Sequence, residues 1–316
     1  MKHCCVIGGS GFIGSHVVKL LAATDRKITV IGRKAGYPGK LPKNTSYIQG
    51  DYADREFLTC ALRGANEVID LAYATVPQTS FKNPVYDIFS NLPSAINLFE
   101  SVIANGVQRL VLISSGGTVY GKAMHVPICE DHVTNPISPY GITKLAVEKY
   151  ARMYGEINSC PFVCVRPGNA FGEGQEPFMG QGFISTAIAS ILLQKEITLF
   201  GESGTIRDYI YVEDLAKGIL AALEKGRNGS FYNIGTGAGY SNRDILDLLN
   251  PLAASAGFDV KIRKEPVRPF DVPVNILDSA KLFNDSGWKS ELPFEAGLKR
   301  TWKWLVNSVK NRHFAG

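Results

Sequence analysis

Apolar and polar residues alternate in blocks along the first half of the chain. Residues 4–7 are all apolar and show no helical spacing, and Gly8 follows at once, which predicts a buried strand that ends in a tight turn. Beyond the turn, Phe12, Ile13, Val17 and Leu21 recur at helical spacing. The same reasoning predicts strands at 28–31, 47–48, 68–72, 110–113 and 163–165, and helices at 84–104 and 140–154.

Helix-length segments therefore separate successive strands, which is the pattern of a parallel sheet with helices on both faces. We predict an α/β fold with a doubly wound Rossmann domain over residues 1–165. After Asn169 the pattern becomes irregular and rich in Gly, Pro and aromatic residues. Residues 166–316 are predicted to form a smaller C-terminal region, with some of its segments returning to the first domain.

Composition and charge exclude several classes of protein. The 316 residues are 45% hydrophobic and 20% charged, and the net charge of +5 contains no run of five like charges, so no nucleic-acid partner is expected. The apolar stretch at 183–193 is broken by three hydroxyl residues and is too short to span a bilayer. None of the six cysteines forms a CxxC pair, so we expect reduced thiols in a cytoplasmic protein and no metal site.

The glycine turn after the first strand predicts a dinucleotide site. Gly8 permits the turn, Gly11 lets the backbone approach a pyrophosphate, and Gly14 allows close packing of the helix. The helix that begins here presents unpaired N–H groups and the positive end of its dipole to phosphates. A strand, a glycine turn and a helix in this order favour NAD or NADP as the cofactor.

The second strand bears on the choice between these two cofactors. Its end normally carries an acid that holds the adenosine ribose, and here that position is Gly32, followed by Arg33 and Lys34. Without the carboxylate a 2′-phosphate is not repelled, and Arg33 could pair with it, which favours NADP. The alternative is that both cations are solvated loop residues. Asp51, at the end of the third strand, could accept a hydrogen bond from the adenine amino group.

Tyr140 and Lys144 are the candidate catalytic pair. Four residues apart, they lie on one face of the predicted helix. A tyrosine with a pKa of about 10 is a poor base at neutral pH, so we expect the Lys144 ammonium and a positively charged nicotinamide to lower it. Tyr140 would then take the proton that accompanies hydride transfer.

These motifs together resemble the extended short-chain dehydrogenases/reductases, in their subgroup of nucleotide-sugar epimerases and dehydratases. The resemblance covers nearly the whole chain in family order. It rests on Gly8, Gly11 and Gly14, Gly50-Asp51, Tyr86 to Asn91, Ser114-Ser115, Val119-Tyr120-Gly121, Tyr140 and Lys144, Arg166-Pro167 with Asn169, Arg207 to Ala216, Asn233-Ile234-Gly235, and Arg268-Pro269-Phe270-Asp271.

The resemblance implies roles for individual residues. Contacts to the cofactor are implied for Gly8, Gly11, Phe12, Ile13, Gly14, Asp51, Tyr52, Leu71, Ala72, Tyr73, Asn91, Ser114, Tyr140 and Lys144. Contacts to the nucleotide sugar are implied for Asn169, Gln181, Arg207, Arg268 and Asp271. The two arginines would bind the diphosphate, and Asp271 the uridine ribose.

One departure from the family pattern concerns the catalytic hydroxyl. The family places a Ser or Thr three residues before the Val-Tyr-Gly turn, where this chain has Gly116. Either Thr118 or Ser115 could supply the missing hydroxyl, and the sequence leaves both open.

The resemblance implies a nucleotide-sugar 4-epimerase acting on a UDP-hexose or UDP-N-acetylhexosamine. Transient oxidation at C4 by tightly bound NAD or NADP would form a 4-keto intermediate, which then receives hydride on its other face. Dehydration is disfavoured, because Gly117 and Thr118 replace the acidic pair that it requires. An NADPH-dependent 4-keto-sugar reductase and a non-catalytic sensor remain alternatives. A homodimer through the helices at 84–104 and 140–154 is also expected.

Overall fold

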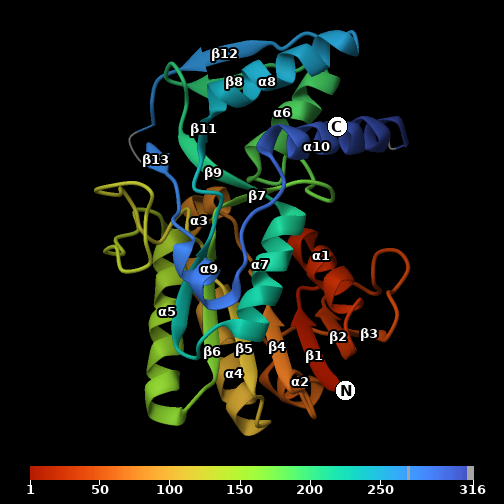
Figure 1. Ribbon diagram of the computed structural model, residues 1–316, viewed down its shortest axis with the longest axis vertical. Helices are drawn as coiled ribbons and strands as arrows, with labels where there is room; N and C mark the ends of the chain where they lie inside the picture. The colour runs from red at the N-terminus through yellow and green to blue at the C-terminus, as the bar shows by residue number, and fades with distance from the viewer. Residues whose placement is uncertain (269–270, 312–316) are drawn as a thin grey trace.

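A parallel sheet of seven strands forms the larger part of the molecule in the computed structural model, which describes residues 1–268 and 271–311 and side chains through residue 308 (Figure 1). The strand order is β10-β6-β5-β4-β1-β2-β3 and every neighbouring pair is parallel. The strands are β1 (Lys2–Ile7), β2 (Arg26–Gly32), β3 (Thr45–Gln49), β4 (Glu67–Asp70), β5 (Arg109–Ile113), β6 (Phe162–Pro167) and β10 (Ser230–Ile234).

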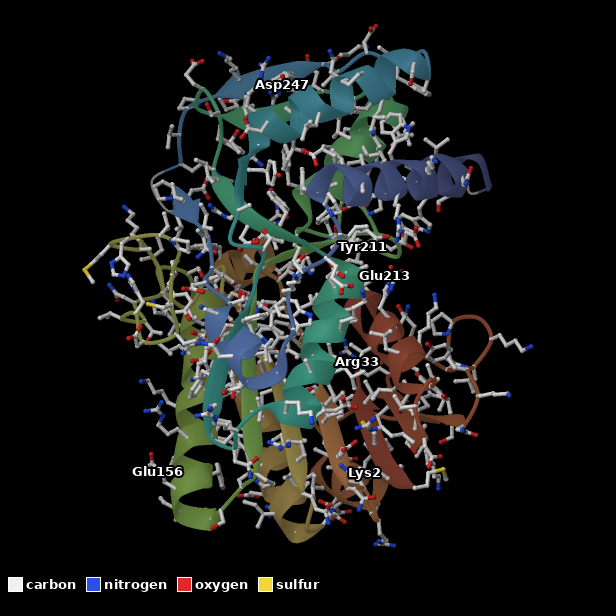
Figure 2. The ribbon with its side chains drawn as sticks, viewed as in Figure 1. Lys2, Arg33, Glu156, Tyr211, Glu213 and Asp247 are labelled. Carbon is white, nitrogen blue, oxygen red and sulfur yellow. The ribbon has the colours of Figure 1, made fainter. Side chains whose placement is uncertain are left out.

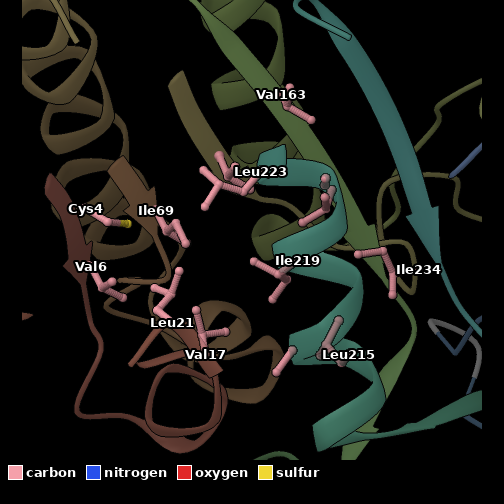
Figure 3. Packing of buried hydrophobic residues seen from close by; sticks show 14 of the residues in the cluster. Cys4, Val6, Val17, Leu21, Ile69, Val163, Leu215, Ile219, Leu223 and Ile234 are labelled. Atoms are coloured by element: carbon pink, nitrogen blue, oxygen red, sulfur yellow. The ribbon is translucent and has the colours of Figure 1, made fainter. Parts of the chain in front are cut away.

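Helices cover both faces of this sheet because alternate strand residues point in opposite directions. One face packs against α1 (Phe12–Leu21) and α7 (Val212–Lys225). The opposite face packs against α2 (Arg55–Ala61), α4 (Pro84–Ala104) and α5 (Pro139–Asn158). Within β1, Cys4 and Val6 belong to the first core, and Cys5 and Ile7 to the second. Figure 3 shows Leu215, Ile219 and Leu223 of α7 in the first core.

A smaller lobe lies beyond the ends of these strands and has its own apolar core (Figure 1). Its helices are α6 (Phe183–Leu192), α8 (Asn242–Ser255) and α10 (Phe294–Asn311). Its strands are β7 (Asn169–Phe171), β8 (Ile197–Phe200), β9 (Ile206–Tyr211), β11 (Gly239–Ser241), β12 (Ile262–Glu265) and β13 (Val274–Asn275). The remaining helices, α3 (Pro77–Lys82) and α9 (Ala280–Ser286), are short.

The chain crosses between the two lobes where β9 passes into α7. Figure 2 labels Tyr211 and Glu213 at this junction, with Asp247 of α8 in the smaller lobe and Lys2 of β1 at the far end of the sheet. The strand β10 and the helix α7 follow residue 165, so the later sequence contributes both an edge strand and a covering helix to the sheet. The division into domains at residue 165 stays a prediction.

The predicted α/β fold with a doubly wound parallel sheet and a smaller C-terminal region is confirmed. Helix α4 has the predicted bounds, whereas α5 continues four residues beyond the predicted end. The predicted strand at 68–72 ends earlier, at Asp70, because the Asp70 carboxylate accepts the N–H of Ala72 at 3.0 Å and turns the backbone away. No helix among the described residues is long and apolar enough to cross a bilayer.

A buried ion pair attaches α5 to the sheet. Arg166 of β6 donates to both carboxylate oxygens of Glu148 on α5, at 2.9 and 2.6 Å, and Glu148 also accepts the hydroxyl of Ser114 at 2.5 Å. Both charged side chains are nearly inaccessible, with exposures of 6% and 3%. Burial removes the hydration of these charges, so neither partner can be lost without leaving the other uncompensated.

We predict that Arg166→Met lowers the free energy of unfolding by about 3–5 kcal/mol, because Glu148 would remain buried without its cation. The matched control is Arg55→Met, which breaks an exposed ion pair with Glu100 and should cost about 1 kcal/mol or less. Urea denaturation of the three proteins provides the comparison. Equal losses in the two variants would contradict the assigned role of the buried pair.

Candidate functional site

The strand order reverses between β1 and β4, and the candidate site lies at this point. In open α/β sheets, ligands bind beyond the carboxyl ends of the strands where the order reverses. The glycine turn follows β1, and the segment Leu71–Tyr73 follows β4. The two are in close contact, because a Cβ added to Gly8 would lie 3.0 Å from the Ala72 nitrogen.

The glycine turn has the geometry that a pyrophosphate needs. Gly8 has a φ of +75°, in the region that favours glycine, and its carbonyl accepts the Gly11 N–H at 3.0 Å. A Cβ on Gly14 would come within 2.3 Å of the Gly8 oxygen, so the helix packs directly on the turn. Among the described residues, no side chain caps α1 and no acid occupies its first turn. Its free N–H groups therefore suit an anion.

Tyr140 and Lys144 lie together in the first turns of α5, as the sequence predicts. Ser138 caps the helix by accepting the Gly141 N–H at 3.1 Å, and Ser80 of α3 accepts the Tyr140 N–H at 3.2 Å. These two bonds fix the backbone of Tyr140. The Lys144 ammonium donates to the Ile113 carbonyl at 2.7 Å, at the end of β5, and lies 5.9 Å from the centre of the Tyr140 ring.

The expected lowering of the Tyr140 pKa depends on a positively charged nicotinamide and stays a prediction; the protein groups around Tyr140 act in the opposite direction. Burial and the neighbouring Asp87 carboxylate raise the pKa of Tyr140 above its ordinary value. Burial also lowers the pKa of Lys144 to about 8, although the carboxylate of Asp70 opposes this change. Sequence spacing places the pair correctly, but it carries no information about how far each group is removed from water.

The other predicted cofactor residues differ in how far their side chains are exposed. Asp51 is exposed and accepts the Ala53 N–H at 3.0 Å. Arg33 is exposed at the end of β2, next to Gly32. Phe12, Ile13, Tyr52, Leu71, Ala72 and Tyr73 are half-buried.

Two predicted cofactor residues use their side chains to support the structure. The Asn91 amide donates to the Thr75 hydroxyl at 3.1 Å and accepts the Ala74 N–H at 2.8 Å. The Ser114 hydroxyl donates to Glu148. The side chains of Asn91 and Ser114 therefore hold neighbouring segments in place.

Gly116 has a structural reason to be glycine. A Cβ there would lie 2.5 Å from a methyl group of Leu277 and 2.8 Å from the carbonyl of Arg166. Thr118 lies next to the start of α5, because its carbonyl is 2.9 Å from the Cβ position of Gly141, and its buried hydroxyl has no partner among the described residues. The Ser115 hydroxyl lies 4.0 Å from the Cβ position of Gly117, which is also 3.3 Å from the side-chain oxygen of Asn169.

Three predicted substrate residues converge in the smaller lobe. Arg268 donates to both carboxylate oxygens of Asp271, at 2.8 and 3.0 Å, and its guanidinium lies 4.0 Å from the centre of the Phe200 ring. Burial lowers the pKa of Arg207, and the positive charge of Arg268 lowers it further. Two guanidinium groups near each other suit a diphosphate. Pro269 and Phe270 of the same motif lie outside the described residues.

The remaining two predicted substrate residues lie on loops and strand ends between the lobes. Asn169 begins β7, and its side-chain oxygen is 3.3 Å from the Cβ position of Gly117 in the Ser-rich loop. Gln181 is exposed in the loop that precedes α6. Asn169 thus lies between the Ser-rich loop and the smaller lobe, whereas no hydrogen bond is formed within the described ranges between Gln181 and the other predicted residues.

Sequence reasoning missed the contributions of three side chains at the site, those of Asp87, Asp70 and Tyr47. Asp87 of α4 accepts hydroxyl hydrogen bonds from Thr75 and from Thr143, the latter at 2.5 Å. Asp70 ends β4, and burial raises its pKa to about 6. Tyr47 fills the space beside Gly32, where a Cβ would lie 2.8 Å from the Tyr47 oxygen. Asp87 and Asn91 on the otherwise apolar face of α4 were the available signal.

We predict that the Lys144 ammonium titrates near pH 8 in the cofactor-free protein, because burial favours the neutral amine. In Asp70→Asn the midpoint should fall further, since the carboxylate that favours the charged form is lost. NMR of protein labelled at the lysine Cε measures both values, and Lys144→Met identifies the resonance. A midpoint near the ordinary lysine value of about 10.4 would contradict the burial of this group.

Comparison with known proteins identifies the family to which the chain belongs. The sequence model described as "NAD dependent epimerase/dehydratase family" matches residues 4–235. A UDP-glucose 4-epimerase from Lactobacillus helveticus is 31% identical over 328 residues, which covers 96% of this chain and 97% of that protein. A dTDP-4-dehydro-6-deoxyglucose reductase from Escherichia coli is 27% identical over 321 residues, covering 96% of each.

A solved structure extends the similarity to the whole fold. The UDP-glucose 4-epimerase of Thermotoga maritima, solved with UDP-glucose, superposes with a TM-score of 0.90 at 30% identity. The match covers 98% of this chain and all of that one. The family expected from the motifs is therefore confirmed, and the chain belongs to the NAD dependent epimerase/dehydratase family.

Proposed function

We propose that the protein is a nucleotide-sugar 4-epimerase that acts on a UDP-hexose or UDP-N-acetylhexosamine. The observation that carries the proposal is the packing of Tyr140 and Lys144 against Tyr73, which belongs to the segment that contacts the glycine turn where the strand order reverses. A proton-transferring phenol at this position can act on a hydroxyl that is being oxidised. The similarity to the epimerases of Lactobacillus helveticus and Thermotoga maritima supports the same reaction.

The cofactor would be held by the glycine turn and the first turn of α1. A bound nicotinamide supplies a site that accepts a hydride and returns it. NAD is the cofactor in the family description, and the second strand favours NADP. The Tyr47 hydroxyl lies 2.8 Å from the Cβ position of Gly32, where the usual ribose-binding acid would begin, and the exposed Arg33 could pair with a 2′-phosphate.

In the proposed reaction, Tyr140 takes the proton of the sugar 4-hydroxyl and later returns one to the 4-keto oxygen. Lys144 supplies positive charge near the phenolate while it exists. Thr118 is our candidate for the hydroxyl that shares the reacting oxygen, because its hydroxyl is buried without a partner among the described residues and its carbonyl lies beside the start of α5. Ser115 remains the alternative.

The smaller lobe would hold the nucleotide sugar. Arg207 and Arg268 are proposed to bind the diphosphate, and Asp271 the ribose of the uridine. In this structure Asp271 is engaged with Arg268, so binding requires the two side chains to exchange partners. Asn169 and Gln181 are proposed to contact the sugar from the lobe boundary.

A 4-keto-sugar reductase that uses NADPH is the second candidate. The exposed Arg33 favours it, because its guanidinium could pair with the 2′-phosphate of NADPH, and Tyr140 would then donate a proton to the ketone. The similarity to the reductase of Escherichia coli supports the same direction. Such an enzyme would exchange its cofactor at every turnover, whereas an epimerase would keep it bound.

We predict that purified protein interconverts UDP-hexose epimers with no cofactor added, and that Tyr140→Phe reduces the rate at least about a hundredfold, because the proton acceptor is lost. Product NMR with a panel of UDP-hexoses measures the rates. Mass spectrometry of the denatured protein identifies the released NAD or NADP and should find equal amounts in both proteins.

The pair Thr118→Ala and Ser115→Ala provides a matched comparison, and the former should lower the rate more. Net reduction of a 4-keto sugar that depends on added NADPH would move the function to the reductase. Absence of any turnover in a protein that retains its dinucleotide would indicate a sensor. Normal epimerisation by Tyr140→Phe would contradict the proposed mechanism.

We further propose a homodimer formed through α4 and α5. These helices pack against each other, and α4 exposes Val85, Tyr86, Ile88 and Phe89. Ile142 of α5 is also exposed. Contiguous exposed apolar side chains on adjacent helices are typical of protein interfaces. The cytoplasm is the proposed location, and the six unpaired cysteines support a reducing compartment.

We predict that Phe89→Asp converts the dimer to a monomer, because it places a charge in the apolar patch that the proposed dimer would bury. Met124→Asp is the control: Met124 is 75% exposed and Phe89 is 73% exposed, but Met124 lies on a loop outside α4 and α5. Light scattering after size-exclusion chromatography measures the mass. A monomeric wild-type protein, or a variant Phe89→Asp that remains dimeric, would contradict the proposed interface.

A further inference from the structure

Tyr73 lies between the two candidate catalytic side chains and touches both. The Lys144 ammonium lies 3.8 Å from the centre of the Tyr73 ring, on its face, where a cation is attracted by the ring electrons. The Tyr73 and Tyr140 rings meet edge to face, with their centres 5.0 Å apart and their planes at 70°. This is a favourable aromatic geometry. Tyr73 belongs to neither helix and follows β4 directly.

A buried carboxylate determines where Tyr73 lies relative to α5. Asp87 of α4 is fully buried. One of its oxygens accepts the hydroxyl of Thr75, two residues after Tyr73, and the other accepts the hydroxyl of Thr143, next to Lys144. Asn91, one turn further along α4, accepts the Ala74 N–H and donates to Thr75. The segment that carries Tyr73 and the helix that carries the catalytic pair are therefore attached to the same buried group.

We propose that Tyr73 is a positioning residue that holds the side chains of Lys144 and Tyr140 in their mutual arrangement. Asp87 in turn fixes the position of Tyr73 relative to α5. The catalytic consequence rests on the proposed function, whereas the geometry does not. Tyr73 acts through the face and the edge of its ring, and it takes no proton in this role.

The surroundings suit a ring that stays uncharged. Burial raises the pKa of Tyr73 above its ordinary value, and the nearby Asp87 carboxylate raises it further. The ring therefore faces Lys144 as a neutral phenol over the working pH range. A phenylalanine preserves the face and the edge, whereas a leucine of similar apolar character offers neither. The two substitutions separate the ring from the hydroxyl.

The first test detects the contact between the Lys144 ammonium and the Tyr73 ring by NMR and requires no substrate. The Cε protons of a lysine above a ring face resonate upfield of those of exposed lysines. In Cε-labelled protein the Lys144 resonance, identified by its loss in Lys144→Met, should lie upfield, stay upfield in Tyr73→Phe, and move to the ordinary position in Tyr73→Leu. An ordinary position in the wild type, or an unmoved resonance in Tyr73→Leu, would overturn the proposal.

Two further variants test the role of Asp87. Thr75→Val and Thr143→Val each remove one hydroxyl from the carboxylate with little change in volume. Each should shift the Lys144 resonance part of the way toward the ordinary position, because one of the two attachments is released. An unchanged resonance in both would remove Asp87 from the proposal. Thermal melting of all variants confirms that the compared proteins are folded.

The second test measures turnover once a substrate is known. Tyr73→Leu should lower kcat about tenfold to a hundredfold, while KM for the nucleotide sugar changes less than about threefold, because misplaced catalytic groups affect the reaction step more than binding. Tyr73→Phe should recover most of the lost kcat. An equal loss in both variants would assign the effect to the hydroxyl and contradict the proposal. A protein without turnover would refute the proposed function, and the NMR result would stand.

Discussion

The hydrogen bond from the Lys144 ammonium to the carbonyl of Ile113 joins the helix α5 to the end of β5, and the site is arranged around it. A buried ammonium is costly unless neighbouring groups compensate for its lost hydration. Here the carboxylates of Asp70, Asp87 and Glu148 favour its charged form, and the Tyr73 ring covers it. The charge of Lys144 thus links two strands and two helices in one polar layer.

This layer continues along the inner face of α5. Thr143 reaches Asp87 on α4, Lys144 reaches the end of β5, and Glu148 reaches Arg166 on β6. Each attachment joins α5 to a different element, so the helix has little freedom to rotate or slide. Catalytic groups held on a rigid element can be placed closely enough for proton transfer.

A second set of polar contacts joins the two lobes. Asp208 of β9 is fully buried, and its carboxylate accepts the N–H groups of Thr236 and Leu277, at 2.8 and 3.2 Å. Asn275 of β13 lies opposite Arg207 in the strand register and donates to the Gly116 carbonyl at 3.0 Å. The proposed diphosphate-binding arginine is thereby tied to the loop that precedes the catalytic helix.

The sequence predicted the sheet well because strands buried on both faces are continuous apolar runs bounded by turns, as residues 4–7 illustrate. It also placed Tyr140 and Lys144 together through helical spacing. It did not place β10, whose short run lies in the irregular second half. The sequence did not predict the raised pKa of Tyr140 or the hydrogen bonds that join Thr75 and Thr143 to Asp87. Both depend on contacts between segments that are distant in the sequence.

The central claim is that the sugar loses and regains a hydride at C4 within one binding event. The most direct measurement incubates the protein with a UDP-hexose that carries deuterium at C4, without added cofactor, and examines the epimer by NMR. The account predicts that the product retains deuterium at C4, because the same hydride returns to the same carbon. A product with ordinary hydrogen at C4, or no epimer with any UDP-hexose, would contradict it.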